Sequence, residues 1–381
     1  KAEAMDQFNI LELIYGEYVN LALKDIKINI DSILERRKAN FDKLKIHRKN
    51  TEAIAVITQK LKRSNFNRSQ ESVVEMLDNL RRRLEETSDI FNSSEGKILI
   101  FRTVGTLLLQ KKAFAQLVDY LLETIADFET NNLFSNDNHS TRLLMRLWLA
   151  NSLFKIRDFK GALLQIERLG EEMKMYSRQN YNTYLFNYYN IRILLLKCLG
   201  NEAESVKLVD EALKEKHITN KDSNKLFLLL SKADHYFNLQ QYSKALAITA
   251  EIRSMSEFAE IDSEIQMYFG IFEMVNRCEI EDYAHIEANA KEFRKTFRKL
   301  LKLEEHQGTN RFLEIVFRMA DAGINDRKVS WKQAYNSYME MHQEQEPGGN
   351  QIFMYDIYLR SKTEDTSYYS LFCETMSSGN A

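Results

Sequence analysis

The sequence predicts an all-α protein: an α-α superhelix of antiparallel helix pairs, preceded by an N-terminal helical region. Three observations support this fold class. The 381 residues include one Pro and 12 Gly, whereas average usage is about 5% and 7%, and strand-rich folds need both residues for their many turns. Apolar side chains recur at helical spacing in most segments. A pattern of two helices also recurs between residues 97 and 345, which is typical of a stacked array.

The first 92 residues predict three or four long helices, which form either an N-terminal bundle or divergent repeats. Residues 9–23 and 72–91 are amphipathic helix candidates. Residues 28–50 place several apolar side chains on one stripe, which charged residues surround. The polar segment at residues 92–96 is the predicted boundary with the repeats. We therefore expect a first domain at residues 1–92.

The segment from Arg36 to Arg68 is locally basic, although the whole chain has a net charge of -2. It is the only candidate for a face that binds phosphates. It has few interleaved aromatic side chains and no recognisable helix-turn-helix pattern. A solvated helix face is therefore the favoured interpretation, and we expect neither a nucleic-acid nor a membrane partner.

The repeated pattern is clearest around residues 145–169, where two apolar helical segments flank Asp158 and Phe159. A small residue, Ala162, follows the aromatic residue by three positions. Later copies have Tyr242 before Ala245, Asp282 before Tyr283, and Trp331 before Ala334. The equivalent positions in the first four copies recur at intervals of roughly 40 to 45 residues, a spacing in the range of helical repeats. These positions are Leu117, Ala162, Ser205 and Ala245.

We expect these copies to form about six helical hairpins over residues 97–345. The small residues let two helices approach closely, and the aromatic residue after the turn closes the end of the hairpin. One such hairpin cannot bury its own apolar face, so the copies must stack. An irregular all-helical bundle is the alternative.

The C-terminal region predicts two capping helices. Residues 342–351 form the only Pro- and Gly-rich break. A short helix is expected over residues 352–361 and another over residues 367–376. We therefore expect a capping region at residues 350–376 that covers the last hairpin.

The repeats resemble the tetratricopeptide repeat family. In that family's frame, Ala150 falls on the small position of the first helix. A later copy of the repeat, at residues 233–245, matches the family's characteristic positions better. Two departures matter: the period, about 40–48 residues, exceeds the family's, and the proline near the end of each repeat is absent. The four matching residues of the later copy are Ala233, Tyr236, Tyr242 and Ala245.

The resemblance implies that the first helix of each pair lines a concave groove. Asparagine amides there can hold a peptide backbone, and phenylalanines can serve as anchors. Leu147 occupies a place where the family's carboxylate clamp needs Lys, so we do not expect binding to chaperone C-termini. The groove positions predicted in this way are Arg102, Thr106, Asn151, Phe154, Lys155, Asn187, Asn190, Lys197, Phe227, Asp234, Phe237 and Asn238.

No catalytic, cofactor or metal motif is present in the sequence. The three cysteines, at 198, 278 and 373, are far apart and form no C-x-x-C pair, which suits a reducing compartment. There is no signal-peptide pattern and no apolar run near the length of a membrane span. We therefore expect a cytoplasmic protein that is not an enzyme, has no cofactor and is not built for a small molecule.

Two functions follow from these expectations. The first is a scaffold that binds a protein or peptide in the groove. The alternative is a bacterial regulator that responds to a peptide or another ligand, with its output in the N-terminal helices or in a domain upstream of Lys1. That layout is similar to peptide-sensing regulators of the response-regulator-phosphatase kind, a likeness of architecture only.

Overall fold

The computed structural model describes residues 8–23, 29–64, 94–321, 327–342 and 353–378. In these residues the chain forms 17 α-helices, several short 3-10 helices and no strand. This confirms the predicted all-α superhelix of helix pairs. Within the same ranges, none of the helices combines the length and apolarity needed to cross a bilayer.

The chain divides into two compact units, residues 1–156 and residues 157–381. The division falls in the turn of the hairpin predicted at residues 145–169, and each unit is described by itself. Part of the predicted boundary at residues 92–96 lies outside the described residues. The predicted domains at residues 1–92, 97–345 and 350–376 therefore stay predictions.

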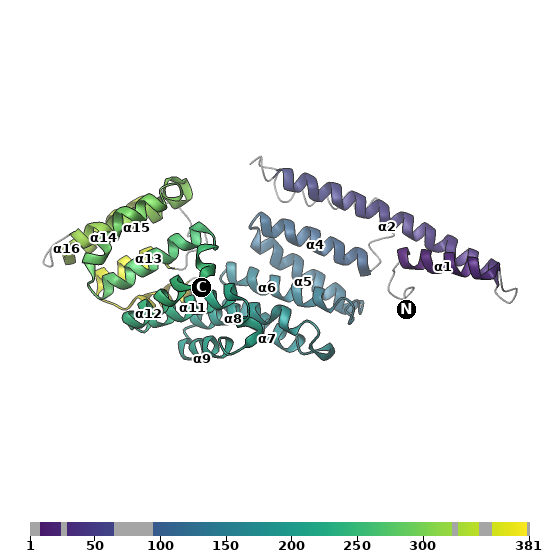
Figure 1. Ribbon diagram of the computed structural model, residues 1–381, viewed down its shortest axis with the longest axis horizontal. Coiled ribbons are helices and arrows are strands. Elements are labelled where there is room, and N and C mark those ends of the chain that lie inside the picture. The colour runs from purple at the N-terminus through teal and green to yellow at the C-terminus, as the bar shows by residue number, and fades with distance from the viewer. Residues whose placement is uncertain (1–7, 24–28, 65–93, 322–326, 343–352, 379–381) are drawn as a thin grey trace. The chain divides into compact units, whose positions relative to one another are not determined.

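Unit 1 begins with a helical hairpin and continues with three adjacent helices (Figure 1). In the hairpin, Leu11, Tyr15 and Leu44 are buried, and Arg37 donates to Glu12 at 2.7 Å. The helices are α1 (Phe8–Ala22), α2 (Ile30–Ser64), α4 (Ser94–Gln110), α5 (Phe114–Thr130) and α6 (His139–Lys155).

Helix α1 leaves a stripe of apolar side chains in solvent. Ile10, Ile14, Tyr18 and Leu21 lie at helical spacing and are each at least 38% exposed. Leu13 beside them is 72% exposed. Helix α1 is therefore apolar both toward α2 and on part of its outer surface.

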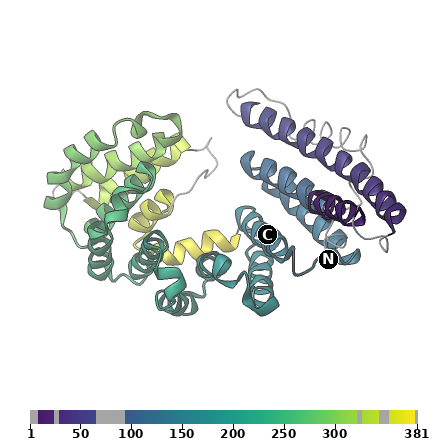
Figure 2. The ribbon, with the colours of Figure 1, turned by 45° about the vertical axis from the view of Figure 1, so that its right-hand side comes forward.

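Unit 2 contains the longer run of helix pairs, which curve around the last two helices of the chain (Figure 2). Its helices are α7 (Phe159–Glu172), α8 (Tyr181–Cys198), α9 (Glu202–Ala212), α10 (Lys216–Thr219), α11 (Asp222–Asn238), α12 (Tyr242–Ser254), α13 (Ser263–Glu279), α14 (Tyr283–Thr296), α15 (Gln307–Asp321), α16 (Arg327–His342), α17 (Tyr355–Glu364) and α18 (Tyr368–Ser378).

Five described turns inside helix pairs share a backbone signature. After the first helix, one residue adopts a left-handed conformation with φ between 55° and 77°. A following N–H then closes onto a carbonyl of the last helical turn, as Gln241 does onto Tyr236 at 2.8 Å. The left-handed residue recurs at the predicted repeat interval, in the turns that contain Lys112, Arg157, Gly200, Gln240 and Glu281.

The small residues of the predicted repeat are buried. Ala162, Ala233 and Ala245 are each 0% exposed, and Ser205 is 7% exposed. The Ser205 hydroxyl also donates to the carbonyl of Ile193 on the preceding helix at 3.0 Å. These positions lie at helix contacts, which agrees with a helical repeat.

In unit 2, the connections between successive pairs contribute to the long period. They carry short helical elements for which a repeat of about 34 residues has no room. Helix α10 fills one of these connections, and 3-10 helices fill three others. The 3-10 elements are η2 (Tyr176–Arg178), η3 (Ser256–Ala259), η4 (Leu300–Lys302) and η5 (Glu304–His306).

Candidate functional site

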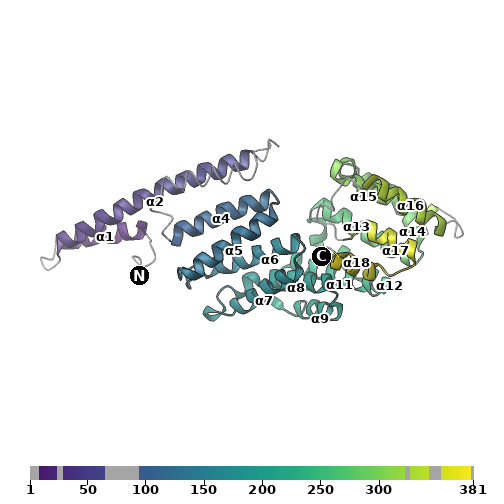
Figure 3. The ribbon, with the colours of Figure 1, turned by 180° about the vertical axis from the view of Figure 1, so that it is seen from behind.

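Helices α8, α11 and α13 are the first helices of their pairs, and α17 and α18 lie against them (Figure 3). We call this side of the three helices the inner face of unit 2. An ion pair fixes the register of α8 and α11, because Lys197 Nζ lies 2.5 Å from Asp234 Oδ2. The two side chains are only 14% and 13% exposed. The structure thus brings together two of the predicted groove residues, but as partners of each other.

Phe237 and Asn238, also predicted for the groove, are buried at 2% and 7% exposure. The ring of Phe237 lies 5.4 Å from those of Phe353 and Tyr368. Phe237 therefore packs on rings of its own chain, and its predicted role as an anchor for a partner stays a prediction. The side-chain amide of Asn238 is buried without a hydrogen-bond partner within the described residues.

A cluster of aromatic rings packs between the inner face and the C-terminal segment. Phe353 stacks on Tyr368 with ring centroids 4.7 Å apart, and Phe312 of α15 stacks on Tyr355 at 4.2 Å. Tyr355 and Tyr358 of α17 are almost fully buried. Such ring pairs contribute stability beyond the area that they bury.

A buried carboxylate anchors α17 at the end of α13. Glu279 accepts a hydrogen bond from the Tyr358 hydroxyl at 2.7 Å and another from Lys362 at 2.6 Å. Burial raises the pKa of Tyr358 well above its ordinary value, and the negative charge of Glu279 raises it further. The tyrosine is therefore a neutral hydrogen-bond donor throughout the physiological range.

Helix α18 covers the C-terminal end of α8. The Tyr369 hydroxyl donates to the carbonyl of Lys197 at 3.3 Å. The ammonium group of Lys197 lies 4.9 Å from the centre of the Phe372 ring, a distance typical of a cation-π contact. We call Lys197, Asp234, Phe237 and Asn238 the covered end of the inner face.

The other end of the inner face is open. Seven residues are almost two helical turns, so Asn190 precedes Lys197, and Phe227 precedes Asp234, on the same faces of α8 and α11. Asn190 and Phe227 are partly exposed, and Leu194 is 38% exposed. We call Asn187, Asn190, Leu194 and Phe227 the open end.

Two asparagines give the open end its polar character. Within the described part of the chain, the side chains of Asn187 and Asn190 make no hydrogen bond and no other specific contact. Each amide offers donors and an acceptor, and each is only partly covered. These two residues can therefore hold a backbone or a polar side chain that arrives from outside.

The remaining predicted groove residues lie in unit 1. Arg102, Thr106 and Lys155 are exposed, and Asn151 and Phe154 are partly exposed. They come from two helices in contact, because the rings of α4 Phe101 and α6 Trp148 are 5.1 Å apart. Five predicted residues thus belong to unit 1 and seven to unit 2, and a single groove through all twelve stays a prediction.

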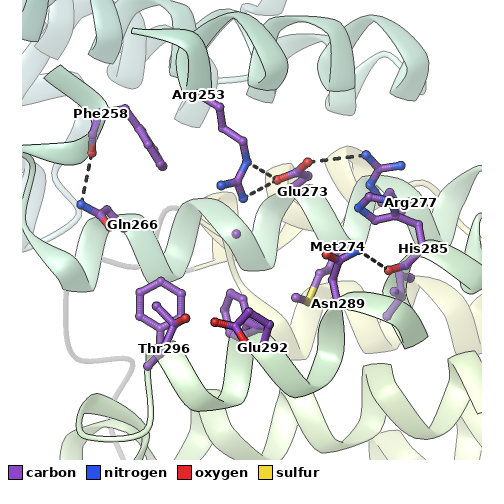
Figure 4. A pocket seen from close by; sticks show the side chains of 14 residues that line it. Arg253, Phe258, Gln266, Glu273, Met274, Arg277, His285, Asn289, Glu292 and Thr296 are labelled. Carbon is purple, nitrogen blue, oxygen red and sulfur yellow. Dashed lines mark hydrogen bonds and ion pairs between the residues drawn. The ribbon is translucent and has the colours of Figure 1, made fainter. Parts of the chain in front are cut away.

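No pattern in the sequence indicates the cavity that lies between α12, α13 and α14 in unit 2 (Figure 4). Its volume is about 440 Å³, within the range of small-molecule sites. Phe258, Met274 and Phe293 give it apolar walls. Gly270 keeps α13 close to α14, since a Cβ atom there would lie 2.6 Å from the Phe293 ring.

Charged side chains at this cavity are paired with one another. Two nitrogens of Arg253 donate to Glu273 at 2.8 and 2.6 Å, and Arg277 bridges Glu273 and Asp282. These two positive and two negative charges cancel, and a further carboxylate of the lining, Glu292, lies 3.8 Å from Lys295. The pair of Glu273 and Arg277 on α13 has i, i+4 spacing and could be predicted from the sequence. The contact of Arg253 with Glu273 could not, because it depends on how α12 packs on α13.

Other polar side chains have partners within the fold. His235 of α11 lies 3.3 Å from Glu202 of α9. Among the described residues, no cluster of three His, Cys, Asp or Glu side chains is arranged to hold a metal. In the basic segment, Arg37 is paired with Glu12, whereas Arg36, Lys38 and Lys43 are exposed.

No protein-family model, curated protein or solved structure matches this chain. The inner face of unit 2 is therefore interpreted from its own residues.

Proposed function

We propose that this protein is a non-catalytic scaffold of the tetratricopeptide-repeat type, which binds a segment of a partner protein or a peptide on the inner face of unit 2. The open end carries the proposal. Asn187 and Asn190 have unused amides there, and Leu194 and Phe227 offer apolar surface beside them. The adjoining covered end already holds two helices by aromatic packing, which illustrates the kind of contact that this face makes.

A photo-crosslinking experiment tests this proposal. A photoreactive amino acid at position 190 in the full chain should trap a partner from the native cell, and the same residue at exposed Asn336 should not. The partner segment is then synthesised, and its affinity is measured by calorimetry.

The asparagines are tested with the same segment. Asn187→Ala with Asn190→Ala should weaken binding at least tenfold, a loss of about 1.4 kcal/mol. The matched control, Asn182→Ala with Asn220→Ala, changes two exposed asparagines and should leave the affinity unchanged. Equal affinity of the two double variants would exclude the open end as the site.

We propose as a second candidate that the chain is a ligand-responsive regulator whose N-terminal helices carry the output. The exposed apolar stripe of α1 and the exposed basic residues of α2 favour it. If the output is nucleic-acid binding, affinity should fall with salt and be lost on changing Arg36, Lys38 and Lys43 to Glu. Binding to a random duplex that survives this change would contradict that form of the output.

We also propose a cytoplasmic location, since none of Cys198, Cys278 and Cys373 forms a disulfide and disulfides are rare in reducing compartments. Fractionation of the native cell, followed by blotting for the protein, would test the location.

A further inference from the structure

Helix α18 occupies part of the face proposed as the binding site, and we propose that it is an internal ligand of that face. On this proposal, the partner is a helix of the same pattern that competes with α18. The inference rests on the proposed function, because it names the kind of partner and the way in which access is regulated.

The side chains of α18 follow the pattern of a helix seated in a groove. Tyr368, Leu371, Phe372 and Met376 are buried and lie at positions i, i+3, i+4 and i+8. The first three positions match the anchors by which amphipathic helices dock into grooves, and the fourth lies one residue after the usual i+7. The opposite face of α18 is polar and exposed at Ser370, Glu374 and Ser377.

The covered end contacts α18 through groups that also have partners outside α18. Lys197 pairs with Asp234, and its ammonium group lies 4.9 Å from the centre of the Phe372 ring. Phe237 also packs on Tyr242 and Phe272. These partners should hold both side chains in place when α18 leaves, so we expect the face to be preformed for a cation-π contact and an aromatic anchor.

Helix α17 differs from α18 in how firmly it is held. It buries Tyr355, Tyr358 and Leu359 almost completely and is tied to Glu279 by two hydrogen bonds. Asp365 then adopts a left-handed conformation with φ of 53°, which ends α17 and separates the two helices. The break allows α18 to leave while α17 remains part of the core.

The competing partner is defined by this geometry. It is an amphipathic helix with large apolar side chains at i, i+3, i+4 and i+8, and with an aromatic ring at the position of Phe372. A helix that replaces α18 can also reach Leu194, one turn before Lys197 on α8. An extended peptide lacks this spacing and should not displace α18.

The test uses a fluorescent synthetic peptide of residues 366–381 and the full chain. Binding is measured by fluorescence anisotropy. The unaltered chain should bind the peptide weakly, because its own α18 fills the face. Leu371→Ala with Phe372→Ala in the full chain should weaken the internal helix and tighten binding at least tenfold. Ser370→Ala with Ser377→Ala, on the exposed face of α18, should have no effect.

Two results would overturn the inference. One is that the Leu371→Ala, Phe372→Ala chain is folded by circular dichroism yet binds the peptide no better than the unaltered chain. The other comes from hydrogen exchange on the unaltered chain, where amides of residues 368–378 should exchange at least tenfold faster than those of residues 355–364. Equal protection of α17 and α18 would mean that α18 does not leave the inner face. This measurement tests the inference even if the variant fails to fold, because it uses the unaltered chain.

The experiments distinguish a failure of this inference from a failure of the proposed function. If the partner trapped at position 190 binds while α18 stays fully protected, the scaffold function holds and the competition is wrong. If the peptide exchanges with α18 but no partner depends on Asn187 and Asn190, the competition holds and the open end is not the site.

Discussion

The covered end and the open end of the inner face lie on the same two helices, α8 and α11, about two turns apart. They differ in whether other parts of the chain pack on them. At the covered end, Phe237 meets four aromatic rings and Lys197 is paired. At the open end, Phe227 has no ring contact among the described residues, and Asn190 is unpaired. Position on a first helix therefore does not decide whether a side chain is packed within the fold or left partly exposed. The aromatic packing at the covered end depends on the C-terminal segment that reaches it.

The largest difference between the two ends should be seen on removal of an aromatic ring. Phe353→Ala removes a ring that packs on Phe237 of the covered end, and because Phe353 is 3% exposed, the change should cost about 3–5 kcal/mol. Phe227→Ala at the open end should cost less than about 1 kcal/mol, because its ring is only partly buried. Urea unfolding measures both. Equal losses would mean that the two ends are packed alike.

The buried tyrosines of α17 and α18 should also make the protein sensitive to alkali. Burial raises the pKa of Tyr355, Tyr358 and Tyr368 above the ordinary value. Their contribution to stability is present below about pH 10 and is lost as pH rises further, because the unfolded chain releases protons that the folded chain keeps. At pH 11 the loss is about 1.4 kcal/mol for each tyrosine, or about 4 kcal/mol for the three.

Urea midpoints at about pH 8 and pH 11 would measure this loss. Tyr368→Phe should reduce the difference between the two pH values by about 1.4 kcal/mol, even though it also removes the hydrogen bond from the Met354 N–H. A midpoint that does not change between the two pH values would show that these hydroxyls reach solvent in the folded protein.

The ion pair at the covered end should give a smaller effect. Lys197→Met leaves Asp234 partly desolvated without its partner, at a cost of about 1–3 kcal/mol. Adding Asp234→Leu should recover part of the loss, because no buried charge then remains. Lys207→Met is the control, since Lys207 is 77% exposed and 3.9 Å from Glu211, and should be neutral within about 0.5 kcal/mol. The prediction would be wrong if Lys207→Met lowered the free energy of unfolding and Lys197→Met did not.

The smallest expected effects lie in the turns that end α8 and α11, next to the covered end. Gly200 and Gln240 both have positive φ values, 77° and 58°. Gln240→Gly should stabilise the protein by up to about 1 kcal/mol, and Gly200→Ala should destabilise it by about 1 kcal/mol. Thermal unfolding would show shifts of opposite sign. Shifts of the same sign would mean that the turn conformation is not what limits these positions.

The helices and their pairing could be predicted from the sequence because both depend on local patterns. The small positions, such as Ala162 and Ala245, were found from spacing alone, and both are buried. Ala162→Trp should accordingly cost about 1–3 kcal/mol or more through overpacking, whereas Trp at exposed Ala247 should be tolerated. The two unfolding midpoints test the assignment directly.

The covering of the inner face could not be predicted, because it depends on contacts between distant segments. Tyr369 meets Lys197 across 172 residues of chain, and Tyr358 meets Glu279 across 79. The sequence indicated two helices after residue 350 but carried no local sign of the surface that they contact. The twelve predicted groove positions therefore include residues that other segments cover and residues that stay partly or fully exposed. Only the contacts of the folded chain distinguish the two groups.

The short helical elements between pairs have a consequence for how this architecture can vary in evolution. The connections at η2, α10, η3 and η4–η5 lie between pairs, whereas the left-handed turns inside pairs keep one conformation. Insertions and deletions are therefore best tolerated in the connections. A descendant chain could lengthen or shorten its period there and still inherit the register of Lys197 with Asp234.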